Sequence, residues 1–127
     1  MRCFPPSREV IVTGSADALH ALAHTVAAGG RCTAGPGSED GAVLLVAVEA
    51  GTAPGPVRVE ADLAERVLRI HGAGEYRAVL GAALHDTAAM TDGGHLHVDH
   101  YPDHPYLAEG SAPLIVESPH GGMPRRP

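Results

Sequence analysis

The sequence predicts an α+β fold of two βαββ-like halves, in which a mostly antiparallel sheet of about six strands carries two helices on one face. Two segments place apolar residues at helical spacing and are followed by paired glycines. Short runs that are β-branched or alternate between polar and apolar residues lie before and after them. When Gly14 is aligned with Gly72, the order strand, glycine turn, helix, strand, strand occurs twice.

The first half begins with residues 1–8, which contain two prolines and are expected to form an irregular lead-in. Residues 9–13, EVIVT, predict a strand. Ser15 is a good N-cap for the helix that follows, and Asp17 suits the positive end of its dipole. The glycines at 29–30 end this helix. Its inward stripe is Leu19, Leu22, Ala23 and Val26.

The middle of the chain predicts strands separated by turns. Residues 31–40 are rich in Gly, Pro and Ser, which indicates a loop with room for a short edge strand. Residues 42–48, AVLLVAV, are continuously apolar and predict a central strand covered on both faces. The alternating runs 57–60 and 66–71 predict a hairpin that turns at 62–65.

The second half predicts a helix from about residue 75 to 91, ended by glycines at 93–94. A strand over 95–99, a loop, and a last strand over 113–117 follow. Residues 118–127 lack periodicity and are expected to be a disordered tail. The predicted inward stripe of the helix is Tyr76, Val79, Leu80, Ala83, Leu84, Thr87 and Met90.

Length and charge limit the classes of function. At 127 residues the default is one domain, here placed over residues 9–117. The net charge of −6, with nine Arg and no Lys, argues against non-specific nucleic-acid binding. It fits a partner with a basic surface, although simple solubility explains it as well.

Two cysteines, Cys3 and Cys32, are too few for a disulfide framework, and whether they pair is left open. The first residues, MRCFPPSREV, show no apolar leader, and no run approaches the ~20 apolar residues that a membrane span needs. A reduced cytoplasmic location is therefore expected.

The most informative stretch is Gly93–Leu107, GGHLHVDHYPDHPYL, which holds four of the nine histidines and two of the three tyrosines. Successive strand residues point to opposite faces, so one face collects His95, His97 and Asp99 while Leu96 and Val98 point inward. A proline then stops the strand. The rigid loop that follows carries Tyr101, Asp103, His104 and Tyr106, and either tyrosine could instead anchor the loop to the core.

The same residues offer an alternative metal site for zinc. Two histidines two apart on a strand can converge on one ion, so the candidate ligands are His95, His97, Asp99, His100 and His104. The letters HxHxDH also match the metal signature of the metallo-β-lactamase superfamily, but the chain is too short for that fold and lacks its downstream ligands.

Other candidate sites are better explained by structural roles. His20 and His24 are spaced i, i+4 as in two-histidine zinc sites, but Ala21 stands where a metalloprotease has its glutamate. Cys32 has no histidine that can be placed beside it as a base. No residue set defines a reaction class, so the chain is predicted not to be an enzyme and to need no cofactor.

The histidine strand and its sequel resemble the C-terminal signature of the immunity protein 32 family of bacterial polymorphic toxin systems. The opening VIVTGSADALHALA and the middle VLRIHG are also similar to that family's layout, so the resemblance extends over residues 9–117, with His100 inserted before the aromatic position. It implies an α+β protein that binds and neutralises a cognate toxin without catalysis of its own. The residues that carry it are His95, His97, Asp99, Tyr101, Pro102, His104, Tyr106, Leu107, Pro113, Leu114, Ile115 and Val116.

The predicted partner-binding surface follows from the displayed loop and this resemblance together. Tyrosine gives a large contact area at low entropic cost, and it is enriched at protein interfaces. The residues predicted to contact the toxin are His95, His97, Asp99, Tyr101, Asp103, His104 and Tyr106.

Overall fold

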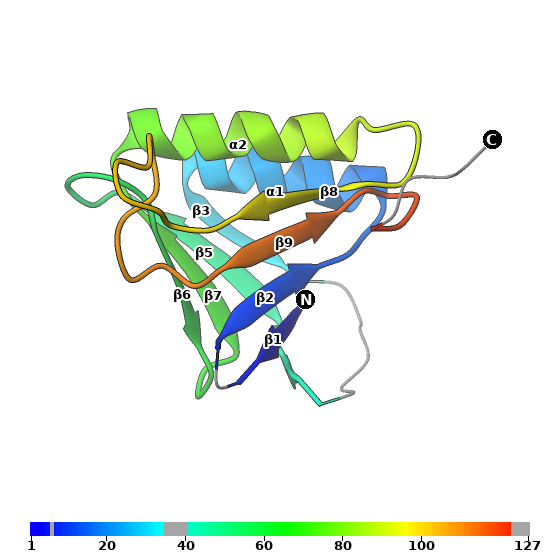
Figure 1. The fold of residues 1–127 in the computed structure, drawn as a ribbon, viewed down its shortest axis with the longest axis horizontal. Helices are drawn as coiled ribbons and strands as arrows, with labels where there is room; N and C mark the ends of the chain where they lie inside the picture. The colour runs from blue at the N-terminus through cyan, green and yellow to red at the C-terminus, as the bar shows by residue number, and fades with distance from the viewer. Residues whose placement is uncertain (6, 35–40, 123–127) are drawn as a thin grey trace.

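The computed structural model describes residues 1–5, 7–34 and 41–122, and this part of the chain has the predicted α+β class (Figure 1). Its helices are α1 (Ala16–Ala28) and α2 (Gly74–Ala88). Its strands are β1 (Arg2–Phe4), β2 (Glu9–Val12), β3 (Gly30–Thr33), β4 (Val43–Leu44), β5 (Ala47–Gly51), β6 (Arg58–Asp62), β7 (Val67–His71), β8 (His95–Val98) and β9 (Leu114–Glu117).

The strands form two mixed sheets, which corrects the single six-stranded sheet that the sequence predicts. Sheet A has the order β4-β1-β2-β9-β8, and sheet B has the order β3-β5-β7-β6. The two helices pack against each other along the same side of the molecule (Figure 1). Side chains from both helices and the inner faces of both sheets share one apolar core.

The predicted repeat is present, but its halves are interleaved. Apart from the two-residue strand β4, the order β1-β2-α1-β3-β5 recurs as β6-β7-α2-β8-β9. Strand β2 pairs in parallel with β9 from the other half, and β5 pairs in parallel with β7. Each sheet therefore contains strands of both halves, because neither half alone buries the apolar face of its own strands.

The predicted irregular lead-in is wrong for residues 2–4, which form β1. This strand pairs antiparallel with β2 on one side and with β4 on the other. The side chain of Cys3 is fully buried in the core. The composition of this segment suggests a loop. It forms a strand because β2 and β4 pair with it on both sides and because Cys3 is buried in the core.

The first helix agrees with its sequence signals. The Ser15 hydroxyl accepts a hydrogen bond of 3.2 Å from the amide of Ala18, as an N-cap does. Gly29, with a φ of 88°, ends the helix in a conformation that favours glycine. The predicted inward stripe is confirmed, since the buried residues are Leu19, Leu22, Ala23 and Val26.

The apolar run 42–48 is not one central strand, as predicted, but crosses from one sheet to the other. Its first part forms β4 in sheet A, and its last two residues begin β5 in sheet B. Between them Leu45 is buried and Val46 is 50% exposed. The expected short edge strand is β3 (Gly30–Thr33), and most of the loop predicted after it, residues 35–40, lies outside the described residues.

The hairpin of β6 and β7 is confirmed. Helix α2 ends at Ala88, and its predicted inward stripe is confirmed only in part, for Leu80, Leu84 and Thr87. Val79 is 48% and Met90 38% exposed. The face is rotated because α2 packs on α1 as well as over the sheets. A Cβ atom on Gly81 would come within 2.9 Å of the Ala27 Cβ. The buried residues are Arg77, Leu80, Gly81, Leu84, Thr87 and Ala88.

Strands β8 and β9 were both predicted, and they pair antiparallel at one edge of sheet A. The prediction of a disordered tail is wrong for residues 118–122. Ser118 is buried, and its hydroxyl donates to the carbonyls of Asp92 and Gly121 at 2.8 and 3.1 Å. The rest of the predicted tail, residues 123–127, lies outside the described residues.

Candidate functional site

The predicted alternation of the histidine strand is confirmed. In β8 the side chains of His95 and His97 are exposed, Leu96 is partly buried and Val98 is buried. Asp99, which follows the strand, is exposed as well. The polar face therefore points to solvent, as the direction of side chains in a strand requires.

His95 is held by the segment that follows β9. Its Nδ1 atom donates to the carbonyl oxygen of Gly122 at 3.0 Å. The backbone of Gly94 bonds to Gly121 and Ser118 beside it. Residues 118–122 thus fix the start of the exposed histidine row.

The loop after β8 is organised by His104. Its Nδ1 atom accepts hydrogen bonds from the amides of Tyr106 and Leu107, at 3.2 and 3.0 Å. Because an accepting Nδ1 needs a free lone pair, the proton of the neutral ring lies on Nε2. Burial, assisted by the nearby His100, lowers the pKa of His104 below its ordinary value.

Aromatic rings gather around His104. Its ring centroid lies 4.6 Å from those of Tyr101 and Tyr106, and 6.4 Å from that of His100. The Tyr106 contact is edge-on, a favourable arrangement for aromatic pairs. The loop is therefore a packed cluster and not an extended strand of exposed rings.

The two tyrosines have different surroundings. Tyr106 packs against the core, and burial raises the pKa of its hydroxyl. Leu107 is buried, and its neighbours bond to the backbone of Val57 at the start of β6. Tyr101 is 54% exposed at the tip of the loop. Tyr106 is therefore the anchor of the loop, and Tyr101 is the tyrosine that is displayed.

The residues named for a metal site do not converge. Within residues 1–5, 7–34 and 41–122, no three side chains of His, Cys, Asp or Glu are grouped so that they could hold a metal ion. The Nδ1 atom of His104 already accepts two amide protons. The arrangement of these side chains gives no support to the zinc alternative.

Three further candidates take other roles. His20 lies against His85 of α2, with their Nδ1 atoms 2.8 Å apart, and His24 is exposed one turn away. Cys3 and Cys32 are both free, and burial raises the pKa of the Cys3 thiol. Cys32 lines a mainly apolar cavity of about 350 Å³ between α1 and β3.

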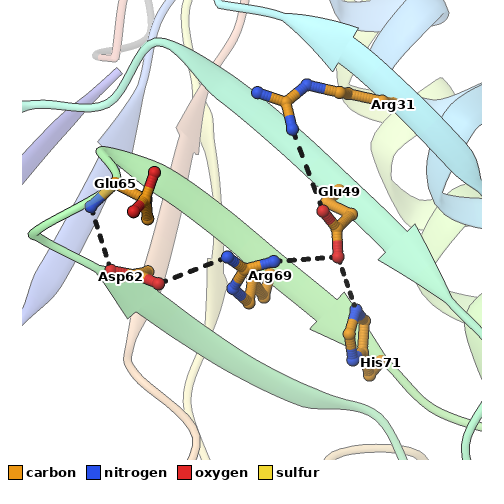
Figure 2. Close-up of polar contacts among 6 residues, drawn as sticks. All are labelled: Arg31, Glu49, Asp62, Glu65, Arg69 and His71. Carbon is orange, nitrogen blue, oxygen red and sulfur yellow. Dashed lines mark hydrogen bonds and ion pairs between the residues drawn. The ribbon is translucent and has the colours of Figure 1, made fainter.

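Sequence reasoning missed an ion network on the outer face of sheet B (Figure 2). Glu49 accepts a 2.9 Å hydrogen bond from Arg69 and lies 3.8 Å from Arg31 and 3.5 Å from His71. Arg69 also bonds to Asp62 at 3.2 Å. Hydrogen bonds from the Glu65 amide and Arg69 lower the pKa of Asp62. The acidic and basic side chains of this network neutralise one another. Their contact depends on the register of β3, β5, β6 and β7, which the sequence alone does not give.

A second missed residue is Arg77, which is buried in α2. Its guanidinium donates to the carbonyls of Val26 and Ala27 in the last turn of α1, both at 3.1 Å. It also donates to the carbonyl of Gly72 and the hydroxyl of Thr52, both at 3.0 Å. The negative end of the α1 dipole stabilises this charge, so Arg77 is a structural link between the helices.

The fold and this surface define an α+β protein that displays polar and aromatic side chains on a rigid strand and loop. A family model described as immunity protein 32 matches residues 67–119, which run from β7 to the segment after β9. The resemblance inferred from the sequence is confirmed for this part of the chain, which includes the whole histidine stretch. It implies an immunity role against a toxin. Neither the curated proteins nor the solved structures that were searched contain a match.

The length and the apolar character of a helix decide whether it could cross a membrane. Neither α1 nor α2, the helices of the described part of the chain, combines the length and apolar character that crossing a membrane requires.

Proposed function

We propose that this protein is an immunity protein that binds a cognate bacterial toxin in the cytoplasm and neutralises it. The observation that carries the proposal is the family match over residues 67–119, since it covers every residue of the predicted partner-binding surface. The net charge of −6 supports association with a partner that presents a basic surface.

The geometry divides the predicted contact residues into two groups. His95, His97, Asp99, Tyr101 and Asp103 are exposed, and we name them the display surface. His104 and Tyr106 lie beneath it and hold the loop in shape. The display surface is pre-organised, so binding pays little entropy for ordering it.

In this proposal the protein acts by occupying the surface through which the toxin works, and it performs no chemical step. Neutralisation then requires a stable complex of one immunity protein with one toxin. The toxin belongs to a polymorphic toxin system and is encoded beside this protein.

The test is co-expression of this chain with the toxin encoded by the neighbouring reading frame. We expect cells that carry both to survive, and cells that carry the toxin alone to die. The purified proteins should elute together as a one-to-one complex whose mass is measured by light scattering. A folded protein that neither rescues cells nor binds that toxin would refute the proposal.

A further inference from the structure

The outer face of sheet B carries charged residues at the positions where the outer face of sheet A, at its equivalent strands, carries apolar ones. On sheet B the strand register places Arg31, Glu49, Arg69 and Glu60 side by side across all its strands. This row alternates in charge, and its central pair forms the 2.9 Å ion pair of the network in Figure 2. A sheet face with such charged side chains can be exposed to solvent without a partner.

The equivalent row on sheet A is apolar at its centre. The register places Leu44, Arg2, Ile11, Ile115 and His97 side by side. These side chains alternate with Val10, Val12, Leu114 and Val116, which are buried in the core, so they point outward. Leu44, Ile11 and Ile115 are partly exposed.

The repeat pairs these rows residue by residue. Aligning Gly14 with Gly72 places Ile11 on Arg69, and the parallel registers then place Ile115 on Glu49. The salt bridge between β5 and β7 in sheet B therefore corresponds to an isoleucine pair between β9 and β2 in sheet A. Contact with solvent does not require isoleucine at these positions, since charged residues occupy the equivalent positions of sheet B. Ile11 and Ile115 lie side by side and are partly exposed on this face, so a partner that covers them would bury apolar surface.

Two acidic residues lie on the same face beside the apolar row, each two positions along the strand from an isoleucine of the row. Glu9 lies opposite Phe4, and Glu117 lies opposite His95. Arg2 is the one basic residue of the row, and it lies over the Phe4 ring at 5.5 Å from its centroid. The net charge of −6 makes two copies of this chain repel each other and attracts a basic partner.

We infer that the outer face of sheet A, centred on Ile11 and Ile115, is the apolar part of the toxin-docking surface. It continues into the display surface through His97, the next residue of the row. The partner it fits is a toxin that presents apolar side chains within a basic rim. This inference rests on the proposed function and specifies the face that carries it out.

The test compares matched substitutions on the two outer faces. Ile115→Arg adds a positive charge at the centre of the sheet A row, and Thr33→Arg adds the same charge to strand β3 of sheet B. We expect Ile115→Arg to raise the Kd for the toxin of the neighbouring reading frame at least tenfold, measured by titration calorimetry. Thr33→Arg should leave it within about twofold.

A milder variant guards against misfolding. Ile11→Thr and Ile115→Thr together retain β-branched strand formers but remove apolar surface, and circular dichroism checks their fold. We expect them to weaken toxin binding by about tenfold as well.

The outcomes separate the two proposals. Wild-type binding that survives all sheet A substitutions overturns this inference and leaves the proposed function standing. A wild-type protein that binds no toxin overturns both. A wild-type dimer in sedimentation that Ile115→Arg dissociates also overturns it, because a second copy would then be the occupant of the face.

Discussion

Replacing His104 by alanine tests whether one imidazole holds the displayed loop in shape. The change removes the acceptor of two backbone hydrogen bonds, at 3.2 and 3.0 Å, and the ring that contacts Tyr101 and Tyr106. At about 1 kcal/mol net for each bond and about 0.5 kcal/mol for lost aromatic contact, the free energy of unfolding falls by about 2 to 3 kcal/mol. Urea denaturation measures this as a lower midpoint with an unchanged slope.

His104→Asn is the matched control. The asparagine side-chain oxygen can accept from the same two amides, as in an Asx turn, but it does not titrate. We expect it to recover more than half of the stability that His104→Ala loses. If alanine and asparagine destabilise the protein equally, the hydrogen bonds of Nδ1 do not hold the loop.

The same pair of variants gives a pH dependence with a defined sign. The pKa of His104 is lower in the folded protein than in the unfolded chain, so the unfolded chain binds more protons between the two values. The contribution of His104 is therefore fully present above about pH 6.5 and is lost as the pH falls through the lowered value. His104→Asn should lack this component, and parallel stability profiles for wild type and His104→Asn would contradict the reasoning.

Four other substitutions or additions give outcomes that can be measured directly. Arg77→Met removes the four hydrogen bonds of the buried guanidinium and should lower the free energy of unfolding by about 3 kcal/mol, whereas the exposed Arg58→Met should change it by less than about 0.5 kcal/mol. Gly81→Val should lower the melting temperature sharply, because its Cβ would lie within 2.9 Å of the Ala27 Cβ; an unchanged melting temperature would show that the helices separate easily. Tyr101→Ala should weaken toxin binding but lower the melting temperature only slightly, through the lost ring contact with His104, and equal affinity would remove Tyr101 from the interface. Zinc titration followed by elemental analysis should find less than about a tenth of an equivalent bound, and one full equivalent would revive the site at His95, His97 and Asp99.

Local signals in the sequence predicted the elements well. The Ser15 cap, the Gly29 termination and the stripe of α1 all depend on a few neighbouring residues, and the structure has them. The outward direction of His95 and His97 followed from the two-residue period of a strand alone. These features are local, so the chain itself specifies them.

Predictions that depended on distant residues were less accurate. The stripe of α2 was right at its centre but wrong for Val79 and Met90, because helix packing through Gly81 and the burial of Arg77 rotate the face that meets the core. Residues 42–48 were predicted as one strand but contribute to two sheets. An apolar composition does not show whether such a run stays in one sheet or crosses to another. The hydrogen bonds of His104 with Tyr106 and Leu107 were not predicted, although these residues are near in the chain, and its contact with a partner stays a prediction.

The sequence by itself determined where the two helices and most of the strands lie, where the first helix begins and ends, and which face of the histidine strand is polar. Only the tertiary structure decided how the two halves share strands and which charges on sheet B meet. It also placed Ile11 beside Ile115, residues that lie far apart in the chain. The physical reason is that side-chain direction follows from backbone period within a few residues, whereas strand partners are chosen by the total apolar surface that the whole chain can bury.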